Sequence, residues 1–191
     1  MPKKIKLFLI LFLLVDLALS FNQYYNTPID GDLTSIVLPS SKYRNVLQDP
    51  IGVEAVSKNS GHGEANRFFT LASAHEYFRT MPFLFQKVMS PISSIYFSAA
   101  VFKLITQILI IFLLSAIASG NFKLTDDRFV LSAALFTIFF QTGGYASTMG
   151  IVDNSISYAI SYAWPISLLL ILLSPILMKV RHHSEMKLNL F

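Results

Sequence analysis

The chain has 191 residues, of which 53% are hydrophobic and only 14% are charged. An ordinary soluble domain carries roughly 25% charged residues, so the composition argues against a water-soluble globule and indicates a protein of the lipid bilayer. The formal net charge of +4 forms no basic face or stripe, which argues against a nucleic-acid partner, and the absence of cysteine excludes disulfides and a cysteine nucleophile.

Four stretches of the chain are apolar enough to be membrane spans, for which about 20 mostly apolar residues are needed to cross a hydrocarbon layer of roughly 30 Å. They are residues 5–21, 95–119, 128–140 and 156–178. The third is short and becomes polar at Gln141, and Pro165 and Pro175 are expected to bend the fourth. We therefore expect an all-α membrane protein with about four transmembrane helices.

The first apolar stretch has two interpretations. Ala18-Leu19-Ser20 resembles the small-residue pattern that precedes a signal-peptide cleavage site. The apolar stretch, however, is longer than the 7–15 residues that are typical of a signal-peptide core. An uncleaved signal-anchor helix over residues 1–21 is therefore preferred to a cleaved signal peptide.

Lysine and arginine in short flanks favour the cytoplasm, and they predict one orientation. With the N-terminus inside, the three basic clusters of the short flanks all fall in the cytoplasm: Lys3, Lys4 and Lys6; Lys123 and Arg128; Lys179, Arg181 and Lys187. We expect a bacterial inner-membrane protein with both termini cytoplasmic. Its parts are the anchor, an extracytoplasmic loop over 22–94, a three-span bundle over 95–180 and a cytoplasmic tail over 181–191.

The long loop divides into two parts. Residues 22–63 are rich in turn formers and are expected to be irregular, with short helical pieces. Residues 65–89 place apolar side chains at helical spacing, which predicts an amphipathic helix that ends or kinks at Pro82, followed by a second apolar stretch. Because both are too short to span, we expect them to lie in the outer membrane interface or to pack against the outer ends of the spans.

Asp30-Gly31-Asp32, shortly after the first span, is the leading candidate for a catalytic motif. Two carboxylates one residue apart can converge on a divalent cation, or one of them can act as a general base. Glycine between them permits the tight backbone that convergence needs. The alternative is an ordinary turn in which the aspartates bond to the local backbone.

The layout around this motif resembles the N-terminal part of the polytopic C-superfamily glycosyltransferases, over about the first hundred residues. The shared features are an anchor with a basic flank, an acidic pair early in a long external loop, then interfacial helices and further spans. The resemblance implies that Asp30 or Asp32 deprotonates an acceptor hydroxyl while a polyprenyl-phosphate sugar donor sits at the outer interface. The chain offers fewer spans than that superfamily has, and its apolar last residues are typical of the start of another span. Two interpretations stay open: a fragment of a larger enzyme, or a complete chain, which would argue against an independent glycosyltransferase.

Two ionisable residues fall inside predicted spans. Lys103 and Asp16 lie at similar depth near the outer leaflet, where a charge marks a candidate functional site. We expect an Asp16–Lys103 ion pair, with Lys103 as a candidate substrate-binding residue. The alternative for Lys103 is that its long stem reaches the interface.

The third span ends in a polar stretch that begins at Gln141 and contains Gly143-Gly144. Non-helical backbone at membrane depth is tolerated only where it lines protein or water. Gln141, Tyr145, Asp153 and Asn154 are therefore candidates for an outward-facing substrate pocket, and an ordinary external turn is the alternative. The histidines lack ligand spacing, so no zinc site is expected.

Three functions remain open from the sequence. The first is a glycosyltransferase-like enzyme that acts on lipid-linked sugars at the extracytoplasmic face. The second is a non-catalytic subunit of a larger membrane complex, in which small residues of the second span allow close helix packing. The third is a transporter component. No resident cofactor is identified beyond the cation that Asp30 and Asp32 are able to hold.

Overall fold

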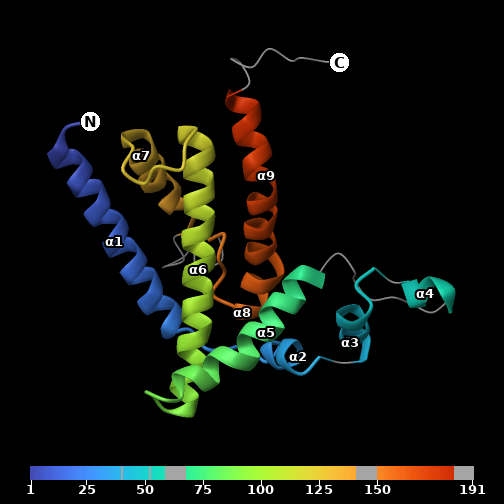
Figure 1. Ribbon diagram of the computed structural model, residues 1–191. Helices are drawn as coiled ribbons and strands as arrows, with labels where there is room; N and C mark the ends of the chain where they lie inside the picture. The colour runs from blue at the N-terminus through green and yellow to red at the C-terminus, as the bar shows by residue number, and fades with distance from the viewer. Residues whose placement is uncertain (40, 52, 59–67, 141–149, 183–191) are drawn as a thin grey trace, which may run out of the picture.

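The computed structural model describes residues 1–39, 41–51, 53–58, 68–140 and 150–182, and within these ranges every regular element is helical (Figure 1). The elements, in chain order, are α1 (Lys3–Tyr25), α2 (Leu33–Val37), α3 (Ser41–Gln48), α4 (Val53–Ser57), α5 (Phe68–Phe85), α6 (Pro91–Ser119), α7 (Asp127–Phe136), the 3₁₀ turn η2 (Thr137–Phe140), α8 (Ile156–Tyr158), the π-helical η4 (Ala159–Ala163) and α9 (Trp164–His182).

Three helical stretches of the described chain are long and apolar enough to cross a membrane. They are Lys3–Tyr25, Pro91–Ser119 and Ile156–Val180, with 23, 29 and 25 residues. At about 1.5 Å of rise per residue, each exceeds the roughly 30 Å of a hydrocarbon layer. More than half of the most apolar stretch of α6 is buried and none of that of α1, so α6 is the central helix and α1 lies on the outside.

The bounds of α6 follow from its end residues. Ser90 accepts a hydrogen bond from the backbone N–H of Ser93, and Pro91 occupies the first helical position, where a missing N–H costs nothing. Gly120 ends the helix in the left-handed conformation, with φ of 77°, which glycine adopts without steric cost. The longest apolar helix is thus delimited by local signals at both ends.

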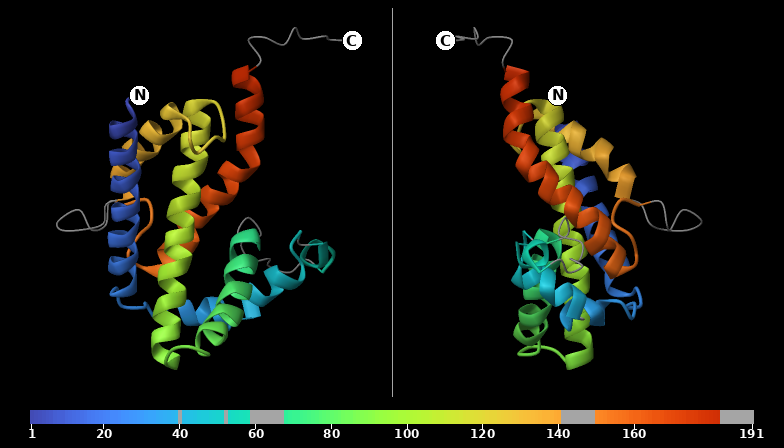
Figure 2. Two further views of the ribbon diagram at one scale, coloured as in Figure 1. Left: turned by 60° about the vertical axis from the view of Figure 1, so that its left-hand side comes forward. Right: turned by 90° about the vertical axis from the view of Figure 1, so that its right-hand side faces the viewer.

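The predicted third span is much shorter than the other three, and the count of four is not confirmed. The ten residues of α7 cover about 15 Å, and η2 adds four residues up to Phe140. The chain reappears at residue 150 beside η2, where the N–H of Ile151 donates to the carbonyl of Phe139. It then runs without helix to α8, at the far end of the bundle (Figure 2).

Both ends of the described chain lie at the same end of the bundle (Figure 1). There, the α-amino group of Met1 and the Lys6 ammonium both bind the carboxylate of Asp127. Lys6 also donates to the carbonyl of Thr125. These contacts join the start of α1 to the start of α7 and leave the long loop between α1 and α6 at the opposite end.

The secondary structure of the long loop agrees with the prediction in the first part of the loop and differs from it in the second. Residues 26–58 contain the short helices α2, α3 and α4 of five, eight and five residues, which confirms the prediction of short helical pieces. The predicted end of the helix at Pro82 and the separate second helix after it are wrong, because α5 continues through Pro82 to Phe85 and residues 86–89 form a turn. The alternative of a kink at Pro82 stays a prediction.

An aromatic cluster holds α5 against the bundle. Phe102 of α6 contacts Tyr77 and Trp164 with ring centroids 5.2 Å apart in each case. The Tyr77 hydroxyl donates to the carbonyl of Ser98 at 3.0 Å, and the Trp164 indole N–H donates to the Ser73 hydroxyl at 2.7 Å. The loop helix is therefore fixed to both α6 and α9.

Most small residues of α6 pack against other helices of the same chain. Ala99, Ala100, Ser115, Ala116 and Ser119 are all buried, and α6 packs against α1, α5, α7 and α9. Small side chains allow such close approach of helices. These five residues therefore contribute to packing within the chain, whereas Ala118, the other small residue at this end of α6, is exposed.

Candidate functional site

Asp30 lies between α1 and α2 and is bonded to the segment that opens α8. Its Oδ2 accepts from the Ser155 hydroxyl at 2.6 Å and from the backbone N–H of Ser157 at 3.2 Å. Ser155 also caps α8, since its hydroxyl oxygen accepts from the N–H of Tyr158. The start of the first loop and the start of the last long helical stretch are thus joined through one carboxylate.

The two oxygens of Asp30 have different surroundings. Burial alone raises the pKa of this carboxyl, but hydrogen bonds from Ser155 and Ser157, together with the nearby backbone N–H of Leu33, outweigh that effect and hold the pKa below its usual value. The other oxygen, Oδ1, is buried and has no hydrogen-bond partner in the protein. An ionised carboxylate with a buried, unpartnered oxygen is uncommon in folded proteins.

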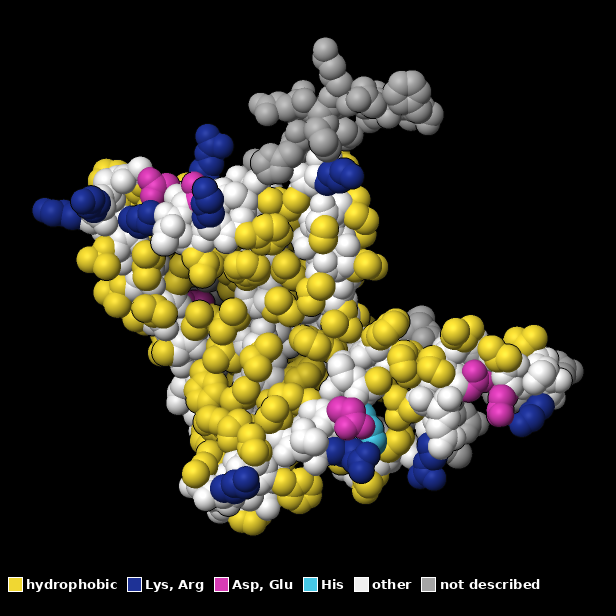
Figure 3. Space-filling model, viewed as in Figure 1, with side chains coloured by type: hydrophobic (Ala, Val, Ile, Leu, Met, Phe, Trp, Pro, Cys, Tyr) yellow, Lys and Arg dark blue, Asp and Glu magenta, His cyan; other side chains and the backbone are white. Residues whose placement is uncertain are grey.

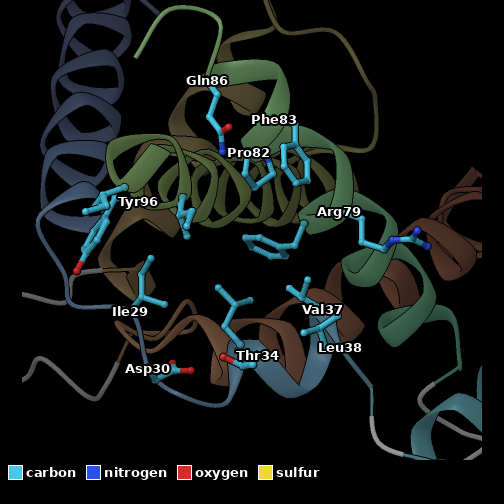
Figure 4. A pocket seen from close by; sticks show the side chains of 14 residues that line it. Ile29, Asp30, Thr34, Val37, Leu38, Arg79, Pro82, Phe83, Gln86 and Tyr96 are labelled. Carbon is cyan, nitrogen blue, oxygen red and sulfur yellow. The ribbon is translucent and has the colours of Figure 1, made fainter. Parts of the chain in front are cut away.

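A groove opens beside Asp30, between α2, α5 and the start of α6 (Figure 4). It has a volume of about 650 Å³ and walls that are largely apolar. Asp30 lies at one end of the groove, while Arg79 lies at the opposite side with its guanidinium directed away from the space (Figure 4). The apolar residues that line it include Ile29, Leu33, Phe78, Phe83 and Ile95. A groove of this size and polarity suits a hydrocarbon chain or another apolar ligand.

Asp32 is placed differently from Asp30. It precedes α2 without capping it through its side chain, it is exposed, and it lines a separate hollow of about 260 Å³ with Ser35, Thr70 and Ser157. The two carboxylates do not share a cavity, so the structure gives no sign that they converge on one cation. Within the described ranges, no group of three or more His, Asp or Glu side chains is arranged to hold a metal ion.

Lys103 is a buried cation rather than a residue of the groove. Its side chain is 2% exposed, and its Nζ donates to the carbonyl of Asn154 at 2.6 Å and lies 5.1 Å from the centre of the Tyr24 ring. Its charge is attracted by Asp153 and Asp30. The expected ion pair with Asp16 is wrong: no such pair occurs between these two described residues, because Lys103 is directed to the segment before α8.

A polar chain continues from Lys103 into α1. The Tyr24 hydroxyl donates to Gln107 Oε1 at 2.9 Å, and the Gln107 amide donates to the Ser20 hydroxyl at 3.2 Å. Tyr24 and Gln107 are both almost fully buried. These bonds link α1 and α6 to the segment that carries Asn154, one residue away from the Ser155 that holds Asp30.

Of the predicted pocket residues, the structure brings two close to Asp30 and Lys103. Asp153 accepts from the N–H of Ser155 at 2.7 Å, and Asn154 provides the carbonyl for Lys103. Gln141 and Tyr145 lie outside the described residues. The role of Asp153 and Asn154 in substrate binding stays a prediction, while their place beside Asp30 is a property of the fold.

Several residues of this site were not selected from the sequence. Ser155 and Ser157 hold Asp30, and Tyr24 and Gln107 support Lys103. The sequence does allow Ser155 to be predicted as a helix cap, because a serine directly before an apolar helical stretch is a common N-cap residue. The π-helical segment Ala159–Ala163 follows Ser157 almost at once, and such segments are frequent at functional sites.

Comparison of the chain with protein-family profiles, with curated proteins and with solved structures gave no match.

Proposed function

We propose that this chain is all or part of a glycosyltransferase-like protein of the bacterial inner membrane, with Asp30 as its general base. It acts at the extracytoplasmic face on a sugar carried by polyprenyl phosphate. The observation that carries the proposal is the buried, unpartnered Oδ1 of an ionised Asp30 at the end of a largely apolar groove of about 650 Å³.

The membrane setting is supported by the three long apolar helices and by the distribution of basic residues in the short flanks. If the end of the bundle with Met1 and Lys6 is cytoplasmic, the groove lies at the outer end, where a lipid-linked donor presents its phosphate. The extracytoplasmic placement of residues 22–94 is part of the proposal.

The chemistry assigns one step to Asp30. An acceptor hydroxyl attacks the anomeric carbon of the donor sugar, the bond between that carbon and the phosphate oxygen breaks, and polyprenyl phosphate leaves with the bonding electrons. The proton of the hydroxyl passes to Oδ1 of Asp30. Hydrogen bonds at Oδ2 favour the ionised form of Asp30, so the carboxylate carries no proton of its own at neutral pH when the hydroxyl attacks.

Proteoliposomes that contain the native-length protein provide the test. Incubation with a labelled polyprenyl-phosphate sugar and a panel of hydroxyl acceptors, including lipids and cell-envelope glycans, is expected to give labelled product and free polyprenyl phosphate in equal amounts. Absence of transfer together with absence of saturable binding of polyprenyl phosphate contradicts the proposal.

A non-catalytic membrane subunit is the second candidate, favoured by the external position of α1. Large apolar residues are exposed along nearly the whole of α1, among them Leu7, Phe8, Leu11, Leu14 and Leu19, and this surface is available to a partner helix as well as to lipid. Purification in mild detergent separates the two functions: a partner in fixed stoichiometry favours the subunit, and a lone protein that binds polyprenyl phosphate favours the enzyme.

A further inference from the structure

Residues 41–58, which contain α3 and α4, form an arm that projects sideways from the helical bundle (Figure 1). Three large apolar residues of this arm are strongly exposed: Ile51 at 85%, Val53 at 64% and Val56 at 83%. Single exposed apolar side chains are common, but a group of them on a short element indicates a surface that contacts something apolar.

The helix α4 separates apolar and charged residues on two faces. Val53 and Val56 are three residues apart and therefore share one face, while Glu54 and Lys58 are four apart and share another. Glu54 and Lys58 form an ion pair at 3.3 Å, and the carboxylate of Asp49 accepts from the N–H groups of Val53 and Glu54 at the start of the helix. A short helix with this division of residues is suited to the boundary between water and an apolar phase.

The orientation of the arm identifies that apolar phase. The arm lies at about the level where α1 ends and α9 begins (Figure 1). Figure 3 shows that hydrophobic side chains gather on the edge of the arm that faces the same way as the long helices, while acidic and basic side chains lie mainly on the opposite edge. A bilayer crossed by α1, α6 and α9 would meet the hydrophobic edge of the arm, with its charged edge left in water.

We propose that the arm lies on the outer surface of the lipid bilayer, with Ile51, Val53 and Val56 inserted among the lipids. The bilayer is favoured over a protein partner because the hydrophobic edge of the arm faces the same way as the apolar spans, and the acidic and basic side chains of the arm lie mainly on its other edge (Figure 3). This inference depends on the membrane setting and is independent of any sugar transfer.

The natural absence of cysteine makes a site-specific probe straightforward. The full-length variants Val56→Cys and Ile51→Cys, each carrying a nitroxide label, are reconstituted in vesicles of phosphatidylethanolamine and phosphatidylglycerol, with Lys58→Cys as the matched control two residues from Val56. Accessibility to oxygen, which concentrates in lipid, is compared with accessibility to a water-soluble nickel chelate.

The expected result is a several-fold higher ratio of oxygen to nickel accessibility at residues 51 and 56 than at residue 58. Equal access of the nickel chelate to all three labels would place the arm in water and overturn the proposal. Labels at 51 and 56 that are immobile and inaccessible to both reagents would mean that protein covers this surface, which overturns the proposal as well. Neither outcome bears on whether the chain transfers sugar.

Discussion

Asp30 accepts a hydrogen bond of 2.6 Å from the hydroxyl of Ser155, although the two residues are separated by 125 positions in the chain. The bond joins the first loop to the segment that begins the last long helical stretch. Because Oδ2 is occupied in this way, only Oδ1 of Asp30 is left without a protein partner. The same contact thus orients the candidate base and connects two distant parts of the sequence.

The two acidic residues of the Asp-Gly-Asp motif are expected to differ in importance. Asp30→Asn removes the ionised carboxylate beside the groove and should lower sugar transfer by about a hundred- to ten-thousand-fold, the usual range for loss of a general base. Asp32→Asn, at an exposed position on a different hollow, should retain most of the activity. Initial rates of transfer from the labelled donor measure the activity of both variants. Comparable losses in the two variants would contradict the assignment of the base to Asp30.

Ser155→Ala should destabilise the protein through two contacts at once. The variant loses the hydroxyl that donates to Asp30 and the oxygen that caps α8, and loss of a cap alone typically costs about 0.5–2 kcal/mol. Thermal unfolding in detergent should show a lower midpoint. Ser161→Ala, a nearby serine on a neighbouring hollow, is the control and should unfold close to the unmodified protein. An unchanged midpoint for Ser155→Ala would mean that the bond to Asp30 contributes little.

Lys103→Met keeps the length of a buried side chain but removes its charge and its hydrogen bond. The carbonyl of Asn154 then loses the bond from Lys103, and loss of a partner for a buried polar group costs about 1–3 kcal/mol. Lys87→Met, at an exposed position in the turn after α5, should leave stability nearly unchanged. Urea or thermal unfolding of the two variants provides the comparison. A Lys103→Met protein as stable as the Lys87→Met protein would show that the buried cation is dispensable.

Stability should fall in acid partly through Asp30. Its pKa in the folded protein lies below the ordinary value of 3.8 because hydrogen bonds favour the ionised form. A group with a depressed folded pKa contributes stability above its unfolded pKa and loses that contribution as the pH falls through the folded pKa. The contribution of Asp30 is therefore complete above about pH 5 and declines below about pH 4.

The pKa values of Asp126 and Asp127 are also lowered, mainly by the N–H of Phe129 and by the N-terminal amino group, respectively. The informative quantity is therefore the difference between Asp30→Asn and the unmodified protein across the pH range. That difference should shrink as the pH falls from 5 to 3. A difference that stays constant in this range would show that Asp30 is not stabilised in its ionised form.

The sequence predicts the long helices well because their signals are local. Ser90, Pro91 and Gly120 delimit α6, and long, mostly apolar runs predict α1 and the stretch from Ile156. The third predicted span is helical over Asp127–Phe136 and continues as a 3₁₀ turn to Phe140, and the start of the polar stretch, residues 141–149, lies outside the described residues. Pro82 was expected to interrupt its helix, but tertiary contacts of Tyr77 and Phe78 with Phe102 hold α5 together.

The candidate site was only partly accessible to sequence reasoning. Asp30 and Lys103 stand out because charge near or within an apolar stretch is costly. Their partners do not stand out in the sequence, because Ser155 and Asn154 are ordinary polar residues. Their importance comes from contacts with residues far away in the chain: Ser155 lies 125 positions from Asp30, and Asn154 lies 51 positions from Lys103. The difference between Asp30 and Asp32 likewise depends on which cavity each lines, and no local pattern reports that.

The π-helical segment Ala159–Ala163 sets the rotational phase between the two halves of the last helical stretch. Each residue of an α-helix advances the side-chain direction by about 100°, so the wider turn of the π segment offsets Ser157, on one side, from Trp164, on the other. This phase allows the Ser157 N–H to meet Asp30 while the Trp164 indole meets Ser73. A one-residue deletion in this segment would restore regular α-helical winding, and only one of these two distant attachments could then be kept.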